Sequence, residues 1–292
     1  MLLSNSKNRL KPQMALPTPH AQAYEECVLK WSSREYPQLR VEKDIAYGDH
    51  PAQRYDVYGR DHTADAPIVV FFHGGGWTNG YKEYAAFMAP YVVAANCVLV
   101  TPSYRLAPEH PLPAAFDDGV ALLGALAATR PSWAGNAQRV VLAGHSAGGH
   151  LAALLALRPD SLEGAGVNPR IIIGCMPVSG IFDLHHPQPA PGSLEARVYD
   201  MVLGDDTDDA RMSPLCWVRS NTVPMVLTYG EHDSERVIHS NRRMASLLAL
   251  QPSPVSCEVE SNADHFQSHT FLDNAAHPWY ARLAALARAS AT

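Results

Sequence analysis

The stretch Val140-Val-Leu-Ala-Gly-His-Ser-Ala-Gly-Gly-His-Leu151 decides how the rest of the chain is interpreted. An apolar run leads into Gly144, and a run of helix-forming residues begins at Ala147. This pattern predicts a strand, a sharp turn and a helix, with Ser146 at the tip of the turn. The backbone at such a tip is strained, and side chains at Gly144 and Gly148 would collide with the neighbouring strand and helix. The turn is typical of a nucleophile elbow, which exposes a serine hydroxyl for attack.

Apolar runs and helical patterns alternate along most of the chain, which indicates an α/β fold with a mainly parallel central sheet and helices on both faces. An opening hairpin over residues 39–47 and 53–58 is expected to form an antiparallel edge. Buried strands are predicted at 67–72, 97–101, 139–144, 171–178 and 223–229, and a short one at 255–259. Helices are predicted at 81–95, 114–128, 147–157, 234–250 and 278–289.

Two segments fall outside this alternation. Residues 1–38 carry a helical pattern from 21 to about 35 and are expected to form an N-terminal strap or lid element. Residues 180–213 are polar and proline-rich, and they are too long for a plain connection, so we expect part of a lid there. We interpret residues 1–292 as a single domain, because the sequence contains no internal repeats and no clear linker.

Composition narrows the classes of function. The net charge is −6, from 23 basic and 29 acidic residues, which argues against a nucleic-acid or anionic-membrane partner. No apolar run approaches the length of a membrane span, and polar residues from Ser4 onward break the start before a secretory signal could form. Five scattered cysteines indicate reduced thiols, so a cytoplasmic location is expected. The oligomeric state is left open, with a homodimer as one expectation.

To act as a nucleophile, a serine hydroxyl needs a base that takes its proton and an acid that orients the base. In folds with a nucleophile elbow, the acid follows the serine in the sequence and the histidine base follows the acid. Both should lie after late strands, where parallel strands end. Asp233 follows the strand at 223–229 and is the preferred acid, with Glu231 as the alternative. His265 follows the strand at 255–259 and is the preferred base, ahead of His269 and His277.

Donors for the developing oxyanion are expected from two places. The backbone N–H of Ala147 follows the nucleophile, and the loop His73-Gly-Gly-Gly-Trp77 follows a buried strand. Gly75 and Gly76 are the predicted donors there, with Gly74 shaping the turn. Aromatic residues near strand ends or in the expected lid are candidates for substrate contacts, although core packing explains them equally well: Trp77, Tyr104, Phe182 and Trp217.

The acidic run at 205–209 lacks the glycine and glutamate spacing of a calcium loop, so a solvated loop is the better interpretation. The chemistry of a serine, a histidine and an aspartate requires neither a metal nor an organic cofactor. We therefore expect no metal site and no cofactor.

The chain resembles the hormone-sensitive-lipase-like branch of the α/β-hydrolases. The resemblance rests on His73-Gly-Gly-Gly-Trp77, Tyr104-Arg-Leu-Ala-Pro-Glu-His-Pro-Leu-Pro-Ala114 and Gly144-His-Ser-Ala-Gly-Gly149. Several segments are also similar to the kynurenine formamidase (arylformamidase) type: Gly144-His-Ser-Ala-Gly-Gly-His-Leu151, Ser179-Gly-Ile-Phe-Asp-Leu184, Gly230-Glu-His-Asp233 and Asp264-His-Phe266. The lipase-like branch often has Asp in place of His145, and the formamidase type usually has a bulkier residue in place of Gly76.

Three functions follow as hypotheses. The first is a carboxylic ester hydrolase for small short-acyl or aromatic esters, which works through an acyl-enzyme. The second is an arylformamidase that cleaves an N-formylkynurenine-like amide with the same residues, so that the partner is a small-molecule ester or amide in either case. The third is a non-enzymatic small-molecule receptor, but such proteins typically lose a triad member and this chain retains all three candidates.

Overall fold

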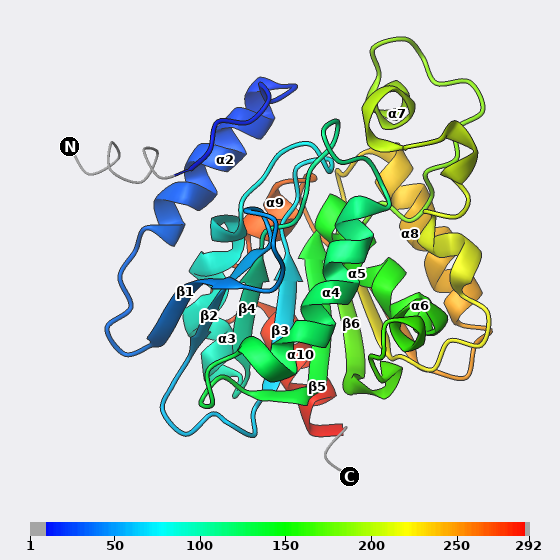
Figure 1. The fold of residues 1–292 in the computed structure, drawn as a ribbon. Coiled ribbons are helices and arrows are strands. Elements are labelled where there is room, and N and C mark those ends of the chain that lie inside the picture. Colours follow the sequence, from blue (N-terminus) through cyan, green and yellow to red (C-terminus); the bar gives the residue numbers. More distant parts are fainter. Residues whose placement is uncertain (1–9, 290–292) are drawn as a thin grey trace.

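The fold is built on one eight-stranded sheet, seen at the centre of Figure 1. The computed structural model describes residues 10–289; residues 1–9, where the sequence predicts the absence of a secretory signal, lie outside the described residues. The strand order is β1-β2-β4-β3-β5-β6-β7-β8. The strands are β1 (Arg40–Ala46), β2 (Arg54–Gly59), β3 (Pro67–Phe72), β4 (Val98–Pro102), β5 (Asn136–His145), β6 (Ile172–Val178), β7 (Met225–Gly230) and β8 (Val255–Glu260).

The sheet is parallel from β4 to β8 and antiparallel at the other side. β3 pairs in parallel with β4 and β5, and the parallel pairing continues through β6, β7 and β8. β1 pairs antiparallel with β2, and β2 pairs antiparallel with β4. The predicted α/β-hydrolase architecture with an antiparallel hairpin at its edge is therefore confirmed.

Both faces of the sheet are buried, which explains the continuous apolar runs. In β3, Val70 and Phe72 belong to the core on one face, while Val69 and Phe71 belong to the core on the other. The first face is covered by α4 (Ala114–Thr129), α5 (Ala147–Leu157), α6 (Pro159–Gly164) and α8 (Glu235–Leu248). The second is covered by α3 (Ala89–Ala94), α10 (Pro278–Ala289) and the N-terminal α2 (Pro19–Ser32).

Most predicted elements occur with ends shifted by a few residues, but the helix expected at 81–95 is divided. A 3₁₀ helix, η1 (Lys82–Met88), precedes α3. Pro90 explains the break, because proline has no N–H to donate into a preceding α-helical turn and fits only the first turn of a helix.

Residues 180–213 form a layer of short helices at the end of the sheet where the parallel strands finish. They contain α7 (Leu194–Arg197), the π-helical η3 (Val198–Val202) and η4 (Asp206–Asp208), and η5 (Pro214–Trp217) follows them. Figure 1 shows α7, α2 and the short α9 (Gln267–Thr270) at this same end. η2 (Pro169–Ile171) directly precedes β6 and lies at the opposite end of that strand. Among residues 10–289, no helix is both long enough and apolar enough to cross a bilayer.

Candidate active site

Ser146 lies on the predicted elbow between β5 and α5. Its φ and ψ are 55° and −116°, a conformation that costs a non-glycine residue about 1–3 kcal/mol. The N–H of Ser146 donates to the Val178 carbonyl at 2.9 Å, and the Ser146 carbonyl accepts from the N–H of His150 at 3.0 Å, so the strained turn is held on both sides.

Close backbone packing explains the two elbow glycines. A Cβ on Gly148 would lie 2.1 Å from the Phe72 carbonyl oxygen, and one on Gly144 would lie 2.4 Å from the carbonyl oxygen of Gly148. Both atoms belong to backbone that cannot move without disturbing β3 or α5. The predicted steric reason for glycine at these positions is therefore present in the structure.

A line of hydrogen bonds connects Ser146, His265 and Asp233. The Oγ of Ser146 lies 2.8 Å from Nε2 of His265, and Nδ1 of His265 lies 2.8 Å from Oδ1 of Asp233. A carboxylate can only accept, so Nδ1 of a neutral His265 carries the proton and Nε2 is free to accept from the serine hydroxyl. The three preferred candidates for nucleophile, base and acid thus lie together with the polarity that proton transfer requires.

Adjacent parallel strands bring these residues together. Ser146 follows β5, Asp233 follows β7 and His265 follows β8, each at the carboxyl end of its strand. The alternatives lie elsewhere. Glu231 is exposed and accepts from the N–H of Asn262, and His277 pairs with Glu260.

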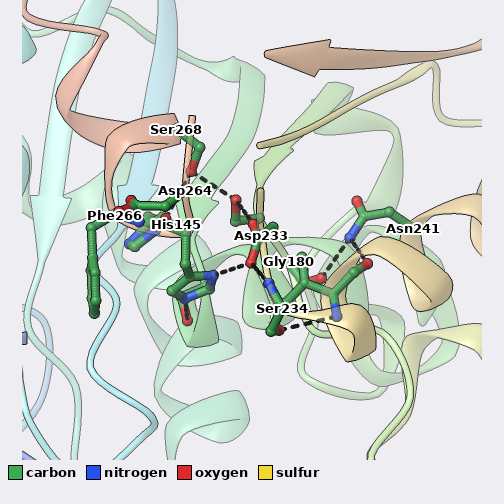
Figure 2. Close-up of polar contacts among 12 residues, drawn as sticks. His145, Gly180, Asp233, Ser234, Asn241, Asp264, Phe266 and Ser268 are labelled. Atoms are coloured by element: carbon green, nitrogen blue, oxygen red, sulfur yellow. Dashed lines mark hydrogen bonds and ion pairs between the residues drawn. The ribbon is translucent and has the colours of Figure 1, made fainter. Parts of the chain in front are cut away.

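Asp233 is fixed by three donors, which Figure 2 shows in part. Besides His265, the N–H of Ser234 donates to Oδ1 at 2.8 Å, and the hydroxyl of Ser179 donates to Oδ2 at 2.5 Å. The Asp233 side chain is fully buried. Ser179 Oγ also lies 2.7 Å from the hydroxyl of Ser268, which is 2.9 Å from the His265 carbonyl oxygen. The acid and the backbone of the base therefore share one hydrogen-bonded network.

The sequence analysis did not assign a role to Ser179 or Ser268. Ser179 follows β6 directly, so it lies at the carboxyl end of the strand between those that carry Ser146 and Asp233. The rule that located the acid and the base could have located Ser179 as well. Ser268 gives no such signal, because its position depends on how α9 packs after the β8 loop.

The glycine loop after β3 lies against the elbow. A Cβ on Gly74 would be 2.8 Å from Nδ1 of His145 and 3.3 Å from Cβ of Ser146. Gly75 and Gly76 have φ of 121° and 61°, which L-residues rarely adopt, and a Cβ on Gly76 would have no neighbour within 4 Å. Over residues 10–289, the N–H groups of Gly75 and Gly76 donate to no protein acceptor. Ala147, at the first position of α5, also has no intrahelical acceptor for its N–H.

The four aromatic residues proposed for substrate contacts all make packing contacts. The Tyr104 hydroxyl donates to the His73 carbonyl at 2.8 Å, and the side chain is buried, as is that of Phe182. The indole of Trp77 donates to Nδ1 of His150 at 3.3 Å. Trp217 stacks on the Arg158 guanidinium. A role for any of them in holding substrate stays a prediction.

Several buried histidines surround the site. Burial lowers the pKa of His73 and of His150 to about 4 each, and that of His269 to about 3. These rings are therefore neutral near pH 7. No group of three or more His, Cys, Asp and Glu side chains between residues 10 and 289 is arranged to hold a metal ion.

Comparison with known proteins identifies the family. A family model described as the alpha/beta hydrolase fold matches residues 69–269, which include the glycine loop, the elbow and the residues Asp233 and His265. This match covers more than half of the chain, so the protein belongs to the α/β-hydrolase family.

Individual relatives are esterases and a formamidase. The carboxylesterase NlhH of Mycobacterium tuberculosis is 35% identical over 131 residues, which make up 44% of this chain and 41% of that enzyme, so the match spans about two-fifths of the relative. Kynurenine formamidase of Danio rerio is 29% identical over 229 residues, 76% of this chain and 74% of the enzyme. A Pyrobaculum calidifontis esterase structure superposes with a TM-score of 0.76 at 21% identity, covering 95% of this chain and 94% of that one, which shows the shared fold.

Proposed function

We propose that the protein is a serine hydrolase that cleaves small carboxylic esters through an acyl-enzyme. The observation that carries this proposal is the unbroken line of hydrogen bonds from Ser146 through His265 to the buried Asp233, with both links at 2.8 Å. The carboxylesterase and the esterase among the relatives support it.

The reaction follows from the proton positions. Ser146 Oγ attacks the ester carbonyl carbon while its proton passes to Nε2 of His265, and Asp233 stabilises the imidazolium through Nδ1–H. The N–H groups of Gly75, Gly76 and Ala147 donate to the oxyanion, and each such donor contributes about 3 kcal/mol to the transition state. His265 then protonates the leaving alcohol. Water, deprotonated by His265, attacks the acyl carbon and releases the acid and the free Ser146 hydroxyl.

The segment 180–213 is proposed as the lid that selects the substrate. Its hydrogen bonds reach several neighbouring elements. Arg197 of α7 donates to Oγ1 of Thr78, just beyond the glycine loop, at 2.9 Å, and the Met212 carbonyl accepts from Nε2 of His150 in α5 at 2.6 Å. The Val202 carbonyl accepts from the N–H of Leu112, in the loop between β4 and α4, at 2.7 Å. A change in this segment would therefore act next to the glycine loop and the helix that follows Ser146. The predicted walls Trp77, Tyr104, Phe182 and Trp217 belong to this same proposal.

The second candidate function is hydrolysis of an aryl formamide, with the same Ser146, His265 and oxyanion donors. The observation that favours it is the length of the match to kynurenine formamidase, which covers 74% of that enzyme. Esters and formamides pass through the same tetrahedral intermediate, so the triad geometry fits both. A cytoplasmic location, a homodimer and the absence of nucleic-acid and membrane partners stay predictions of the sequence.

Steady-state rates test the proposal. We expect the wild type to hydrolyse p-nitrophenyl acetate and butyrate with a higher kcat/KM than it shows on N-formylkynurenine, and we expect Ser146→Ala to lose both activities while it keeps its unfolding midpoint. A higher kcat/KM on N-formylkynurenine would establish the formamidase in place of the esterase. Turnover that survives in Ser146→Ala would refute both.

A further inference from the structure

The residue before the nucleophile also holds the catalytic base. Nε2 of His145 lies 2.8 Å from the backbone carbonyl oxygen of His265, while the adjacent Ser146 bonds to the side chain of the same histidine. We propose that His145, supported by Tyr24 and His269, is a positioning device that fixes the backbone of His265. These three side chains are called the histidine clamp below. The proposal rests on the proposed function, because it assigns the clamp to the base of that reaction.

The proton positions within the clamp follow from its partners. A carbonyl oxygen can only accept, so Nε2 of His145 must carry a hydrogen and donate it to His265. The pKa of His145 lies well below its usual value because the ring is buried, with further repulsion from His265 and His269. His145 is therefore neutral, and its Nδ1 is left as an acceptor.

Tyr24 connects the clamp to the N-terminal helix. Its hydroxyl lies 2.8 Å from Nδ1 of His269 and 3.4 Å from Nδ1 of His145, and the two imidazole rings stack with centroids 5.0 Å apart. Since His145 Nδ1 accepts, the hydroxyl of Tyr24 donates to it, and Nδ1–H of His269 donates to the hydroxyl. If the hydroxyl instead donated to His269, the ring proton of His269 would lie on Nε2, which has no partner. A buried N–H without an acceptor is rarer in proteins than a buried acceptor without a donor, so this order is disfavoured. Donation thus runs in one direction, from His269 through Tyr24 and His145 to His265.

A second donor converges on the same carbonyl oxygen. The hydroxyl of Ser268 lies 2.9 Å from it and also lies 2.7 Å from Ser179, which donates to Asp233. Figure 2 shows His145, Ser268 and Asp233 in the same close-up. The carbonyl of His265 is therefore held by the elbow on one side and by the network of the acid on the other.

His265 needs such support because of where it lies. It is in the loop between β8 and α9, its side chain is 25% exposed, and no strand fixes its backbone. A displacement of a catalytic group by about 1 Å can reduce the rate by about 100-fold. His145, by contrast, is 1% exposed on the rigid end of β5. The clamp transfers that rigidity to the loop, and Gly74 leaves the room that Nδ1 of His145 occupies.

Substitutions of His145 test the clamp. His145→Leu removes the donor, and we expect kcat on p-nitrophenyl butyrate to fall about 10- to 100-fold with little change in KM, because the base is displaced while the binding surface is kept. His145→Gln places an amide N–H near the position of Nε2 and should restore most of the lost kcat. The control is His277→Leu, which removes another buried histidine whose partner is Glu260 and should keep the wild-type kcat.

Three further variants separate positioning from stability. Tyr24→Phe removes the hydroxyl's bonds to His145 and His269 but leaves the donor from His145 to the His265 carbonyl, so it should lower kcat by less than His145→Leu. Tyr280→Phe removes a buried hydroxyl that bonds to Leu272 and should not change kcat. Ser268→Ala and His145→Leu should be non-additive in kcat, since both donors hold one carbonyl.

Each outcome decides the proposal. Wild-type kcat in His145→Leu, or equal loss in His145→Leu and His145→Gln variants that unfold at the same urea concentration, would overturn the clamp. If His145→Leu does not fold, a wild-type kcat in both Tyr24→Phe and Ser268→Ala would overturn it as well. Failure of the proposed function looks different, because the wild type itself would then hydrolyse neither the ester nor the formamide.

Discussion

The residues that hold the base and the acid contrast with the segment 180–213 above them. His145, Ser179, Ser268 and His269 are all at most 1% exposed. The first three are hydrogen-bonded to one another or to His265 and Asp233, and His269 stacks on His145. In the segment, Leu194 is 59% exposed, and the Arg243–Asp183 pair that anchors it involves an arginine side chain that is 64% exposed. The difference predicts that the proposed chemical step depends on the buried network, whereas the proposed substrate selection depends on a more exposed segment.

The largest effect is expected on kcat, and a comparison of two Asp–His pairs reveals it. Asp233→Asn should lower kcat by about 10⁴-fold, because an amide favours the wrong tautomer of the base. Asp209, in the segment, lies 2.5 Å from Nδ1 of His185, a similar pair without a serine. Asp209→Asn should leave kcat near the wild-type value and act on KM. Ester kinetics of both variants check this, and comparable losses of kcat would remove the distinction between the two regions.

Glycine substitutions should separate the regions by stability. Gly148→Ala puts a Cβ 2.1 Å from the Phe72 carbonyl oxygen, and we expect a loss of unfolding free energy above about 3 kcal/mol. Gly192 in the segment has φ of +76° and no neighbour within 4 Å of a Cβ, so Gly192→Ala should cost only about 1–2 kcal/mol of backbone strain. Urea unfolding measures both values. A Gly148→Ala variant as stable as Gly192→Ala would contradict the close packing of the elbow.

Acidic pH should lower the free energy of unfolding, because the buried histidines are neutral in the folded protein and become protonated on unfolding. Burial lowers the pKa of His73 and His150 to about 4 and of His269 to about 3, from 6.5 in the unfolded chain. Unfolding therefore takes up protons below pH 6.5, and stability that is fully present above that pH is lost as pH falls toward 4. Between the folded and unfolded pKa values of a histidine, the free energy of unfolding falls by about 1.4 kcal/mol for each pH unit. Urea unfolding between pH 7 and 4.5 measures it. His73→Gln should reduce the slope, and an unchanged slope in that variant would contradict the assignment.

The smallest effect is expected at the surface of the segment. Arg243→Gln removes the ion pair with Asp183, and an exposed pair of this kind contributes less than about 1 kcal/mol. The unfolding free energy should change by no more than that, and the dependence on salt should be weak. A loss of several kcal/mol would mean that the segment is as tightly coupled to the core as the elbow is.

The sequence predicted the elements that local patterns encode. Periodicity identified the strands, and the place directly after the last strand favoured His265 over His277. Glu231 follows the same strand as Asp233, and only the structure separates the two, because Asp233 bonds to His265 while Glu231 bonds to Asn262. The same reasoning could have found Ser179 at the end of β6. The break of the helix at 81–95 into η1 and α3 was missed although Pro90 marks it.

The clamp could not be predicted, because its members are distant in the sequence. Tyr24 lies 121 positions before His145 and 245 before His269. No periodicity relates three such segments. Their contact depends on how α2 and α9 pack over the end of the sheet, which is a property of the whole core. For the same reason, the sequence named aromatic candidates such as Tyr104 without showing that its hydroxyl is already bonded to His73.

The most direct test of the central claim is covalent labelling with a fluorophosphonate, followed by intact mass and peptide mapping. The wild type should gain one phosphonyl group on Ser146, because His265 and Asp233 activate this hydroxyl alone. Ser146→Ala, with an unchanged unfolding midpoint, should gain none. A wild-type protein that remains unlabelled, or a label that persists elsewhere in Ser146→Ala, would contradict the assignment of Ser146 as the nucleophile.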